Sequence, residues 1–154
     1  MNSVSFHPDS QIIASASTDQ TIKLWSKEGK LLKTLLGHKD AVLAVAWSHD
    51  GKILASSSAD KNKIRLWNQE GVLLMVLKGD AEELTSVSFS PDGKILAAGS
   101  GQGHVILRKL SDITLASLFK SNCHILKDYL LYNSTITRSD AYREQSYRTL
   151  CQND

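Results

Sequence analysis

The sequence predicts an all-β chain of three similar units, each made of four antiparallel strands, followed by a short α-helical C-terminal tail. Three observations support this. Similar stretches recur every 41–42 residues. Short apolar runs alternate with polar turns about every ten residues. All nine glycines lie at or before Gly103, so the turn chemistry ends well before the C-terminus.

The repeat is clearest in two stretches of each unit. The stretches that begin at Val4, Val45 and Val87 lie 41 and 42 residues apart, and Trp25 and Trp67 close equivalent stretches 42 residues apart. We therefore expect a repeat region over residues 1–119 and a helical cap over 120–154. The expected repeats cover about residues 1–36, 37–78 and 79–119.

Each repeat predicts its strands in the same order. A first strand of the form Val-x-Phe or Val-x-Trp precedes a Ser-Pro-Asp-Gly type of turn, in which Pro fixes φ and Gly accepts a positive φ. The second strand, Ile-Leu-Ala-Ser, leads to a tight turn that carries Asp19 or Asp60. The third strand reads Ile-Lys-Leu-Trp or Ile-Arg-Leu-Trp, and a fourth is expected over 31–36 and 72–77.

Composition and charge exclude several classes of partner. The 154 residues carry a net charge of +2, which gives no general attraction toward nucleic acid or an anionic membrane. No apolar run approaches the roughly 18–20 residues of a membrane span, and we expect no signal peptide. Two cysteines are too few to stabilise a secreted fold by disulfides, so we expect a cytoplasmic protein. From the charge and the lack of a long apolar run, we expect no nucleic-acid or membrane partner.

The repeat motifs resemble those of a known family. Gly37-His38, the Ser-Pro-Asp-Gly turns, Ser-x-Ser-x-Asp and the closing Ile-Lys-Leu-Trp resemble the WD40 repeat of β-propellers over residues 1 to about 119. The resemblance implies three antiparallel four-stranded blades of an incomplete propeller. A closed propeller has 4–8 blades, so two faces would stay open. Expected partners are therefore proteins of unknown identity or further WD40 blades that complete the ring.

The tail carries a second resemblance. Cys123–Leu130 and Arg148–Cys151 resemble the C-terminal end of bacterial, cyanobacterial-type multidomain WD40 signalling proteins. This resemblance implies a short two-helix cap closed by the two cysteines. The chain departs from the pattern by the extra residues 141–147. We expect Cys123 and Cys151 to be two small apolar residues of the cap, with a disulfide or a redox switch as the alternative.

His38, Ser56 and Asp60 are also the residue types of a hydrolase triad. The resemblance implies instead that these three residues and Trp67 form a buried structural tetrad that ties strands to a loop. No Gly-x-Ser-x-Gly elbow is present to expose a nucleophile. We therefore expect no catalytic residues, no cofactor and no enzyme activity.

The tetrad is unevenly represented among the repeats. The first repeat keeps Ser15, Asp19 and Trp25. The four positions of the third repeat hold Asp80, Ala98, Gln102 and Arg108. We therefore expect the third blade to be the least stable. His7 and His49 share a turn position that raises the question of a metal pair, but we expect exposed turn histidines and no metal site.

The resemblance also implies a partner-binding face, formed by alternate residues after the His of each repeat and by the residue before the turn Asp. On this chain the face consists of Asn2, Thr18, Lys39, Ala41, Leu43, Ala59, Ala81, Glu83, Thr85 and Gly101. The predicted function is a non-catalytic protein-interaction scaffold or sensor module in a larger bacterial signalling protein or assembly. The alternatives are a detached gene fragment without independent activity, or a hydrolase.

Overall fold

A computed structural model of the chain describes residues 1–60, 63–78 and 83–110. These ranges belong to one compact unit, Met1–Leu110, and within them the structure consists of strands and turns without an α-helix. The strands are β1 (Ser3–Phe6), β2 (Ile12–Ala16), β3 (Ile22–Ser26), β4 (Leu31–Leu35), β5 (Val42–Trp47), β6 (Ile53–Ser58), β7 (Lys63–Asn68), β8 (Leu73–Lys78), β9 (Leu84–Phe89), β10 (Ile95–Ser100) and β11 (Val105–Lys109).

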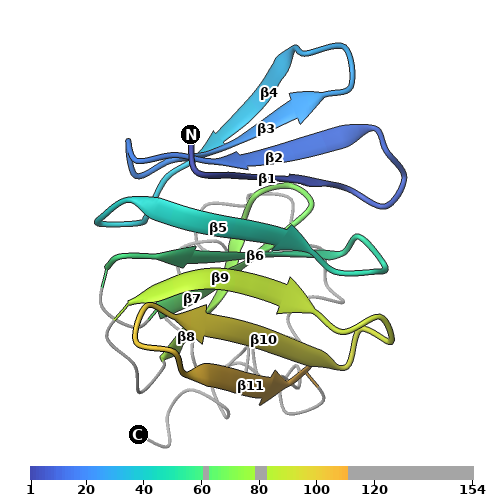
Figure 1. Ribbon diagram of the computed structural model, residues 1–154. Coiled ribbons are helices and arrows are strands. Elements are labelled where there is room, and N and C mark those ends of the chain that lie inside the picture. The colour runs from blue at the N-terminus through green and yellow to red at the C-terminus, as the bar shows by residue number, and fades with distance from the viewer. Residues whose placement is uncertain (61–62, 79–82, 111–154) are drawn as a thin grey trace, which may run out of the picture. The chain divides into compact units, whose positions relative to one another are not determined.

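The strands form antiparallel sheets in simple up-and-down order (Figure 1). Blade 1 is β1-β2-β3-β4 and blade 2 is β5-β6-β7-β8, and the described part of blade 3 is β9-β10-β11. The predicted four-stranded repeat is thus complete in blades 1 and 2. The fourth strand expected for blade 3, the boundary at 119 and the helical cap over 120–154 lie outside the described residues.

The turns after the first strand of each blade have the predicted backbone geometry. Gly51 and Gly93 adopt φ of 72° and 67°, in the left-handed region that glycine enters without steric cost. Blade 1 has Ser10 at this position, and it adopts the same conformation with a φ of 59°. Asp50 and Asp92 accept a hydrogen bond from the backbone two residues later, each at 3.1 Å. The predicted turn type is confirmed in all three blades.

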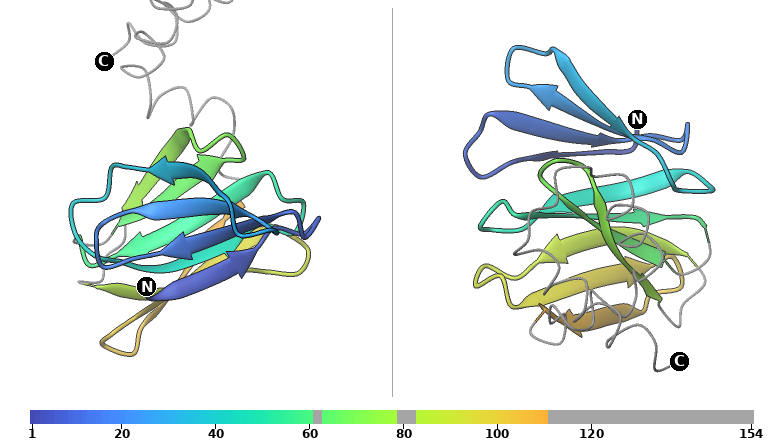
Figure 2. Two further views of the ribbon diagram at one scale, coloured as in Figure 1. Left: turned by 90° about the horizontal axis from the view of Figure 1, so that it is seen from above. Right: turned by 180° about the vertical axis from the view of Figure 1, so that it is seen from behind.

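Each blade has two faces, because side chains alternate across a strand and directly paired residues share a side. We call the face toward the preceding blade the leading face and the face toward the following blade the trailing face. The sheets follow one another in chain order within Met1–Leu110 (Figure 2), with β1 and β2 against β5, and β5 and β6 against β9.

The apolar core lies between neighbouring sheets. The trailing face of blade 1 contributes buried small and branched residues, and the leading face of blade 2 contributes large ones that pack against them. The core contains Ala14, Ala16, Ile22, Leu24, Leu35, Val42, Val45, Trp47, Leu54 and Trp67. Each blade therefore buries its apolar side chains mainly by stacking on its neighbours.

Candidate functional site

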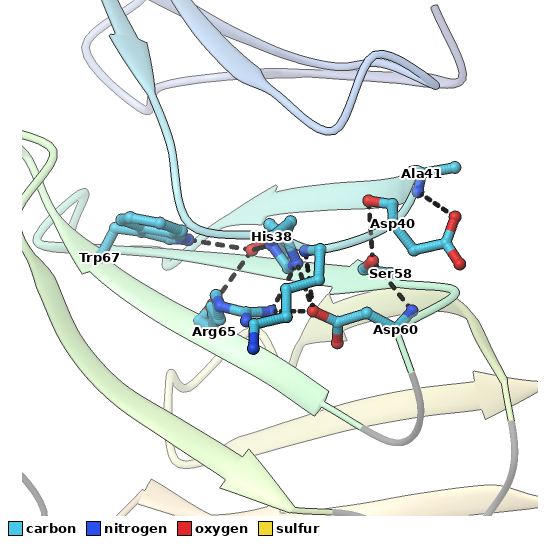
Figure 3. Close-up of polar contacts among 9 residues, drawn as sticks. His38, Asp40, Ala41, Ser58, Asp60, Arg65 and Trp67 are labelled. Atoms are coloured by element: carbon cyan, nitrogen blue, oxygen red, sulfur yellow. Dashed lines mark hydrogen bonds and ion pairs between the residues drawn. The ribbon is translucent and has the colours of Figure 1, made fainter.

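A cluster of polar side chains is buried in blade 2 (Figure 3). His38 lies in the connection between β4 and β5, and Ser56 lies on β6. Asp60 lies in the turn after β6, and Arg65 and Trp67 lie on β7. Ser56 and Arg65 are directly paired across β6 and β7, so their side chains lie on the same face of the sheet. Trp67 lies on that face too, because it follows Arg65 by two residues on β7. We call these five residues the blade 2 network.

Ser56 is the acceptor at the centre of the network. Its Oγ lies 2.9 Å from Nε1 of Trp67, which can only donate, and 2.7 Å from Nε2 of His38. The Ser56 hydroxyl in turn donates to the carbonyl of Arg65 at 3.4 Å. The side chain is fully buried, at 0% exposure. Ser56 therefore joins a loop and two strands, and its hydrogen-bonding capacity is used within the protein.

Arg65 determines the tautomer of His38. Its Nη1 lies 2.7 Å from Nδ1 of His38, and a guanidinium group can donate but not accept. Nδ1 must therefore be the unprotonated acceptor, and the imidazole proton lies on Nε2 and is donated to Ser56. In a hydrolase triad the histidine nitrogen next to the serine accepts the serine proton. The hydrogen bond between His38 and Ser56 has the opposite direction.

The charge state of His38 agrees with this arrangement. Burial, and after it the positive charge of Arg65, lower the pKa of His38, while Asp60 acts against both, and the net result is a pKa of about 4. His38 is therefore neutral near pH 7. A neutral imidazole whose free lone pair is engaged by Arg65 has none left to accept a proton from Ser56.

Asp60 joins the network through Arg65. Its Oδ2 accepts from Nη1 of Arg65 at 2.9 Å and from the backbone N–H of Lys39 at 3.1 Å. The distance from Oδ2 to Nδ1 of His38 is 3.9 Å, and no proton is available between them. The structure thus brings together all four predicted tetrad residues, with a fifth residue placed between His38 and Asp60.

Sequence reasoning did not single out Arg65. The signal was present in the pattern Ile-Arg-Leu-Trp, whose alternation places Arg65 and Trp67 on one face. Ser58 belongs to the quoted Ser-x-Ser-x-Asp motif, but the sequence assigned it no role: its hydroxyl donates to the carbonyl of Asp40 at 3.2 Å and accepts from the N–H of Asp60 at 3.1 Å. Ser58 therefore fastens the loop before β5 to the turn after β6 (Figure 3).

Blade 1 contains only part of the arrangement. Nε1 of Trp25 donates to Oγ of Ser15 at 2.8 Å, as at the equivalent pair in blade 2. Asp19 is exposed and accepts from the Thr21 hydroxyl at 2.7 Å, within its own turn. Lys23 occupies the position of Arg65, and its Nζ lies 3.7 Å from Oδ2 of Asp19. Asp19 therefore does not join Ser15 and Trp25.

Blade 3 has different residues at the described network positions. Ala98 is buried in place of Ser56, and Ile106 stands where blade 2 has Arg65. Arg108 replaces the tryptophan, and its Nη2 donates to the carbonyl of Lys78 at 3.1 Å. Gln102 is exposed in the turn after β10, and Asp80 lies outside the described residues. The described part of blade 3 is therefore held mainly by its strand pairing and apolar contacts.

The prediction of exposed turn histidines is wrong for His7 and confirmed for His49. His7 is buried, with its ring edge-on to Trp47 at 4.8 Å between centroids and its Nε2 3.0 Å from the carbonyl of Gly51. It is buried because the β1–β2 turn packs on blade 2. His49 is exposed. Among the residues that the structure describes, no group of three or more His, Cys, Asp or Glu is placed to hold a metal ion.

The residues predicted to bind partners lie together at one end of the blades, where each first strand begins and each second strand ends. In blade 1, Nδ2 of Asn2 donates to Thr18 at 3.2 Å and to the Val42 carbonyl of blade 2 at 2.8 Å. In blade 2, the N–H of Ala59 donates to the carbonyl of Ala41 at 3.0 Å.

The same pairing continues in blade 3. There the N–H of Gly101 donates to the carbonyl of Glu83 at 3.2 Å, and the Thr85 hydroxyl donates to the carbonyl of Gly99 at 3.3 Å. We call this end of the blades the loop face. Its exposed members are Asn2, Thr18, Lys39, Glu83, Thr85 and Gly101, and its half-buried members are Ala41, Leu43 and Ala59. Ala81 lies outside the described residues.

Comparison with known proteins agrees with the repeat structure. A family model described as "WD domain, G-beta repeat" matches residues 1–26, 29–68 and 71–108, about two-thirds of the chain.

In the ranges that the structure describes, no helix is long and apolar enough to cross a membrane.

Several curated proteins are similar to parts of the chain. The Kluyveromyces lactis "Probable cytosolic iron-sulfur protein assembly protein 1" is 38% identical over 73 residues, which cover 40% of this chain and 22% of that protein. The Tuber melanosporum "Nuclear distribution protein PAC1" is 52% identical over 52 residues, 34% of this chain and 12% of that protein. The human "Intraflagellar transport protein 122 homolog" is 40% identical over 62 residues, 40% of this chain and 5% of that protein.

The chain spans about a fifth or less of the length of these relatives. They are fungal or human, so they do not support the bacterial affiliation that the tail suggested. The repeat period, the blade topology and the family match agree over residues 1–108. The chain therefore belongs to the WD40 repeat family.

Proposed function

We propose that this chain is a non-catalytic interaction module that binds a protein partner through its loop face. The observation that carries the proposal is that consecutive blades place exposed, chemically varied side chains at the same end. At that end the backbone is fixed by hydrogen bonds within and between blades. Loops positioned by a rigid scaffold are a common place for recognition.

The chemistry of the loop face favours a polypeptide as partner. Blade 2 contributes a cation, Lys39, beside the half-buried apolar side chains of Ala41 and Leu43, while blade 3 contributes the carboxylate of Glu83. One charge of each sign with apolar surface suits a protein segment of mixed character. Such a surface lacks the clustered positive charge that nucleic acid or an anionic membrane requires.

The blade 2 network supports a structural role for the triad-like residues. The direction of the hydrogen bond from His38 to Ser56 and the burial of Ser56 disfavour the alternative of a hydrolase. No observation favours that second candidate, so we propose no enzyme activity, catalytic residue or cofactor.

Other parts of the proposal stay predictions. They are a cytoplasmic location, membership of a larger assembly, a bacterial signalling context, repeats at about 1–36, 37–78 and 79–119, and a helical cap over 120–154. The alternative of a detached fragment without independent activity predicts that the loop face captures nothing.

Site-specific photo-cross-linking tests the proposal. A benzophenone amino acid at Thr85 places the probe on the loop face, while the same probe at Asp92 lies at the opposite end of β9 and is also exposed. We expect Thr85, but not Asp92, to form an adduct with a defined protein in extract. The adduct should be lost when Lys39→Glu and Glu83→Lys are introduced together. Equal adducts at both ends, or none at either, would contradict the proposal.

A further inference from the structure

The leading face of blade 1 exposes side chains whose counterparts in blade 2 are buried. Val4 and Phe6 are 52% and 63% exposed, whereas Val45 and Trp47, their equivalents one repeat later, are 5% and 7% exposed. Ile13 and Trp25 complete this face and correspond to Leu54 and Trp67. Blade 1 therefore presents, uncovered, the kind of surface that blade 2 buries against a neighbouring blade.

The trailing face of blade 3 is the matching half. Val105 and Leu107 are 70% and 60% exposed, whereas Ile22 and Leu24, at the same positions of blade 1, are 0% and 3% exposed. Ala97 and Gly99 take the places of Ala14 and Ala16 on this face, and Ser86 and Ser88 take the places of Ser3 and Ser5. The chain thus carries both halves of a blade-to-blade contact that it already makes internally.

The polar contacts of the internal contact have counterparts on the uncovered faces. Between blades 1 and 2, the N–H of Val45 donates to Ser3 at 3.4 Å and the N–H of Trp47 donates to Ser5 at 3.2 Å. On the uncovered faces the equivalent hydroxyls belong to Ser86 and Ser88, both exposed, whereas blade 2 has alanine at these positions. The equivalent N–H groups belong to Val4 and Phe6 of the edge strand β1.

We propose that a second copy of this chain covers the leading face of blade 1 with the trailing face of its own blade 3. The contact is head to tail, so each copy offers one face of each kind. Residues 1–108 hold three matched repeats, so two copies supply six blades, within the 4–8 blades of closed propellers, and three copies would exceed that range. The predicted assembly is therefore a two-copy, six-bladed ring with two identical joints.

Shape favours this arrangement over a contact between two leading faces. In the internal contact, the large side chains of Trp47 and Trp67 pack against the face that carries Ala14 and Ala16. If two leading faces met, Phe6 and Trp25 of one copy would face Phe6 and Trp25 of the other, and no small side chains would leave room for them.

Charged substitutions on each face test the proposal in the full-length chain. Light scattering coupled to gel filtration should give the wild type twice the mass of one chain. Phe6→Glu, on the leading face, and Leu107→Glu, on the trailing face, should each reduce the mass to that of a monomer. Val72→Glu is the matched control, because Val72 is an exposed apolar residue in the β7–β8 turn, away from both faces. It should leave the dimer intact.

A mixture of the two face variants distinguishes the head-to-tail contact from other modes. Neither variant alone has an intact joint, but the Phe6→Glu chain keeps its trailing face and the Leu107→Glu chain keeps its leading face. The mixture should therefore recover a dimer through one joint. Far-UV circular dichroism matching the wild type in each variant shows that loss of mass does not come from unfolding.

Three results would overturn the proposal. If the wild-type chain stays monomeric at high concentration, no second copy covers the leading face of blade 1. A dimer that survives Leu107→Glu uses another contact, or has that face covered by residues 111–154 of its own chain. Open-ended polymers instead of a discrete dimer mean that the ring does not close. Each outcome leaves the loop-face proposal standing, because cross-linking at Thr85 does not depend on this contact.

Discussion

Blades 2 and 3 share a backbone plan and differ in how their polar positions are filled. Leu54 pairs with Trp67 in blade 2, and Leu96 pairs with Arg108 in blade 3, in the same register. Blade 2 adds a buried network of five polar and aromatic side chains, which blade 3 lacks at the positions that the structure describes. Apolar alternation and turn chemistry are therefore enough to form the sheet.

Blade 1 helps to identify what the network adds. It keeps the bond between Ser15 and Trp25, yet Asp19 remains exposed in its own turn. In blade 2, His38 and Arg65 link the serine to the aspartate and to the incoming loop. The network thus fastens the loop and the turn at the end of blade 2 that forms part of the loop face.

The largest expected effect comes from removing the tryptophan of blade 2. Trp67→Ala should lower the free energy of unfolding by about 3–5 kcal/mol, because a fully buried aromatic side chain is lost and a cavity remains. The matched change Trp25→Ala should cost clearly less, because Trp25 is only half-buried. Urea unfolding followed by circular dichroism measures both. Equal losses would show that the two blades do not differ as described.

Removing the buried guanidinium should have an effect of similar size. Arg65→Met leaves Asp60 without its ion-pair partner, and breaking a buried pair by removing one member costs about 3–5 kcal/mol. Lys23→Met is the control in blade 1, where the partly exposed pair with Asp19 is worth about 0–1 kcal/mol. A small loss for Arg65→Met, in the same unfolding experiment, would contradict the central place given to Arg65.

The buried His38 predicts a stability that depends on pH. Its folded pKa is lowered to about 4 from 6.5, so its contribution is present above pH 6.5 and is lost as the pH falls toward 4. The loss over this window is on the order of 3 kcal/mol. Unfolding free energies measured from pH 7 to pH 4 test this. The pH dependence should be weaker in His38→Gln, and an unchanged slope in that variant would assign the effect to other groups.

The smallest effect is expected for the central hydroxyl. Ser56→Ala should cost about 1–3 kcal/mol, because it leaves two buried donors without an acceptor. Ser15→Ala, which leaves only the half-buried Trp25 donor unpaired, should cost about 1 kcal/mol or less. An unchanged stability together with the loss of a hydrolytic activity in Ser56→Ala would favour the hydrolase alternative.

Much of the fold was predictable because it depends on local patterns. Alternating residues predicted the strands, and glycine at Gly51 and Gly93 predicted the turns, since positive φ favours glycine. The fourth strands differ from the predicted ranges by one residue, at the C-terminal end of β4 and at both ends of β8. The four tetrad positions were predictable only through resemblance to a family.

The contacts between blades could not be read in the same way. His7 was expected to be exposed, because a polar Pro-Asp turn is typically at the surface. Its burial depends on the stacking of blade 1 on Trp47, which one repeat alone does not reveal. The position of Arg65 between His38 and Asp60 depends on a cross-strand register and a loop path at the same time.

The most direct measurement is the protonation state of His38 by nitrogen-15 NMR of the imidazole ring. We expect a neutral ring at pH 7 with its proton on Nε2, which then remains neutral until the pH falls to about 4. That result means that His38 donates to Ser56 and that the network holds the blade together. A proton on Nδ1, or titration near the ordinary pKa of about 6.5, would contradict it and make His38 available as a base.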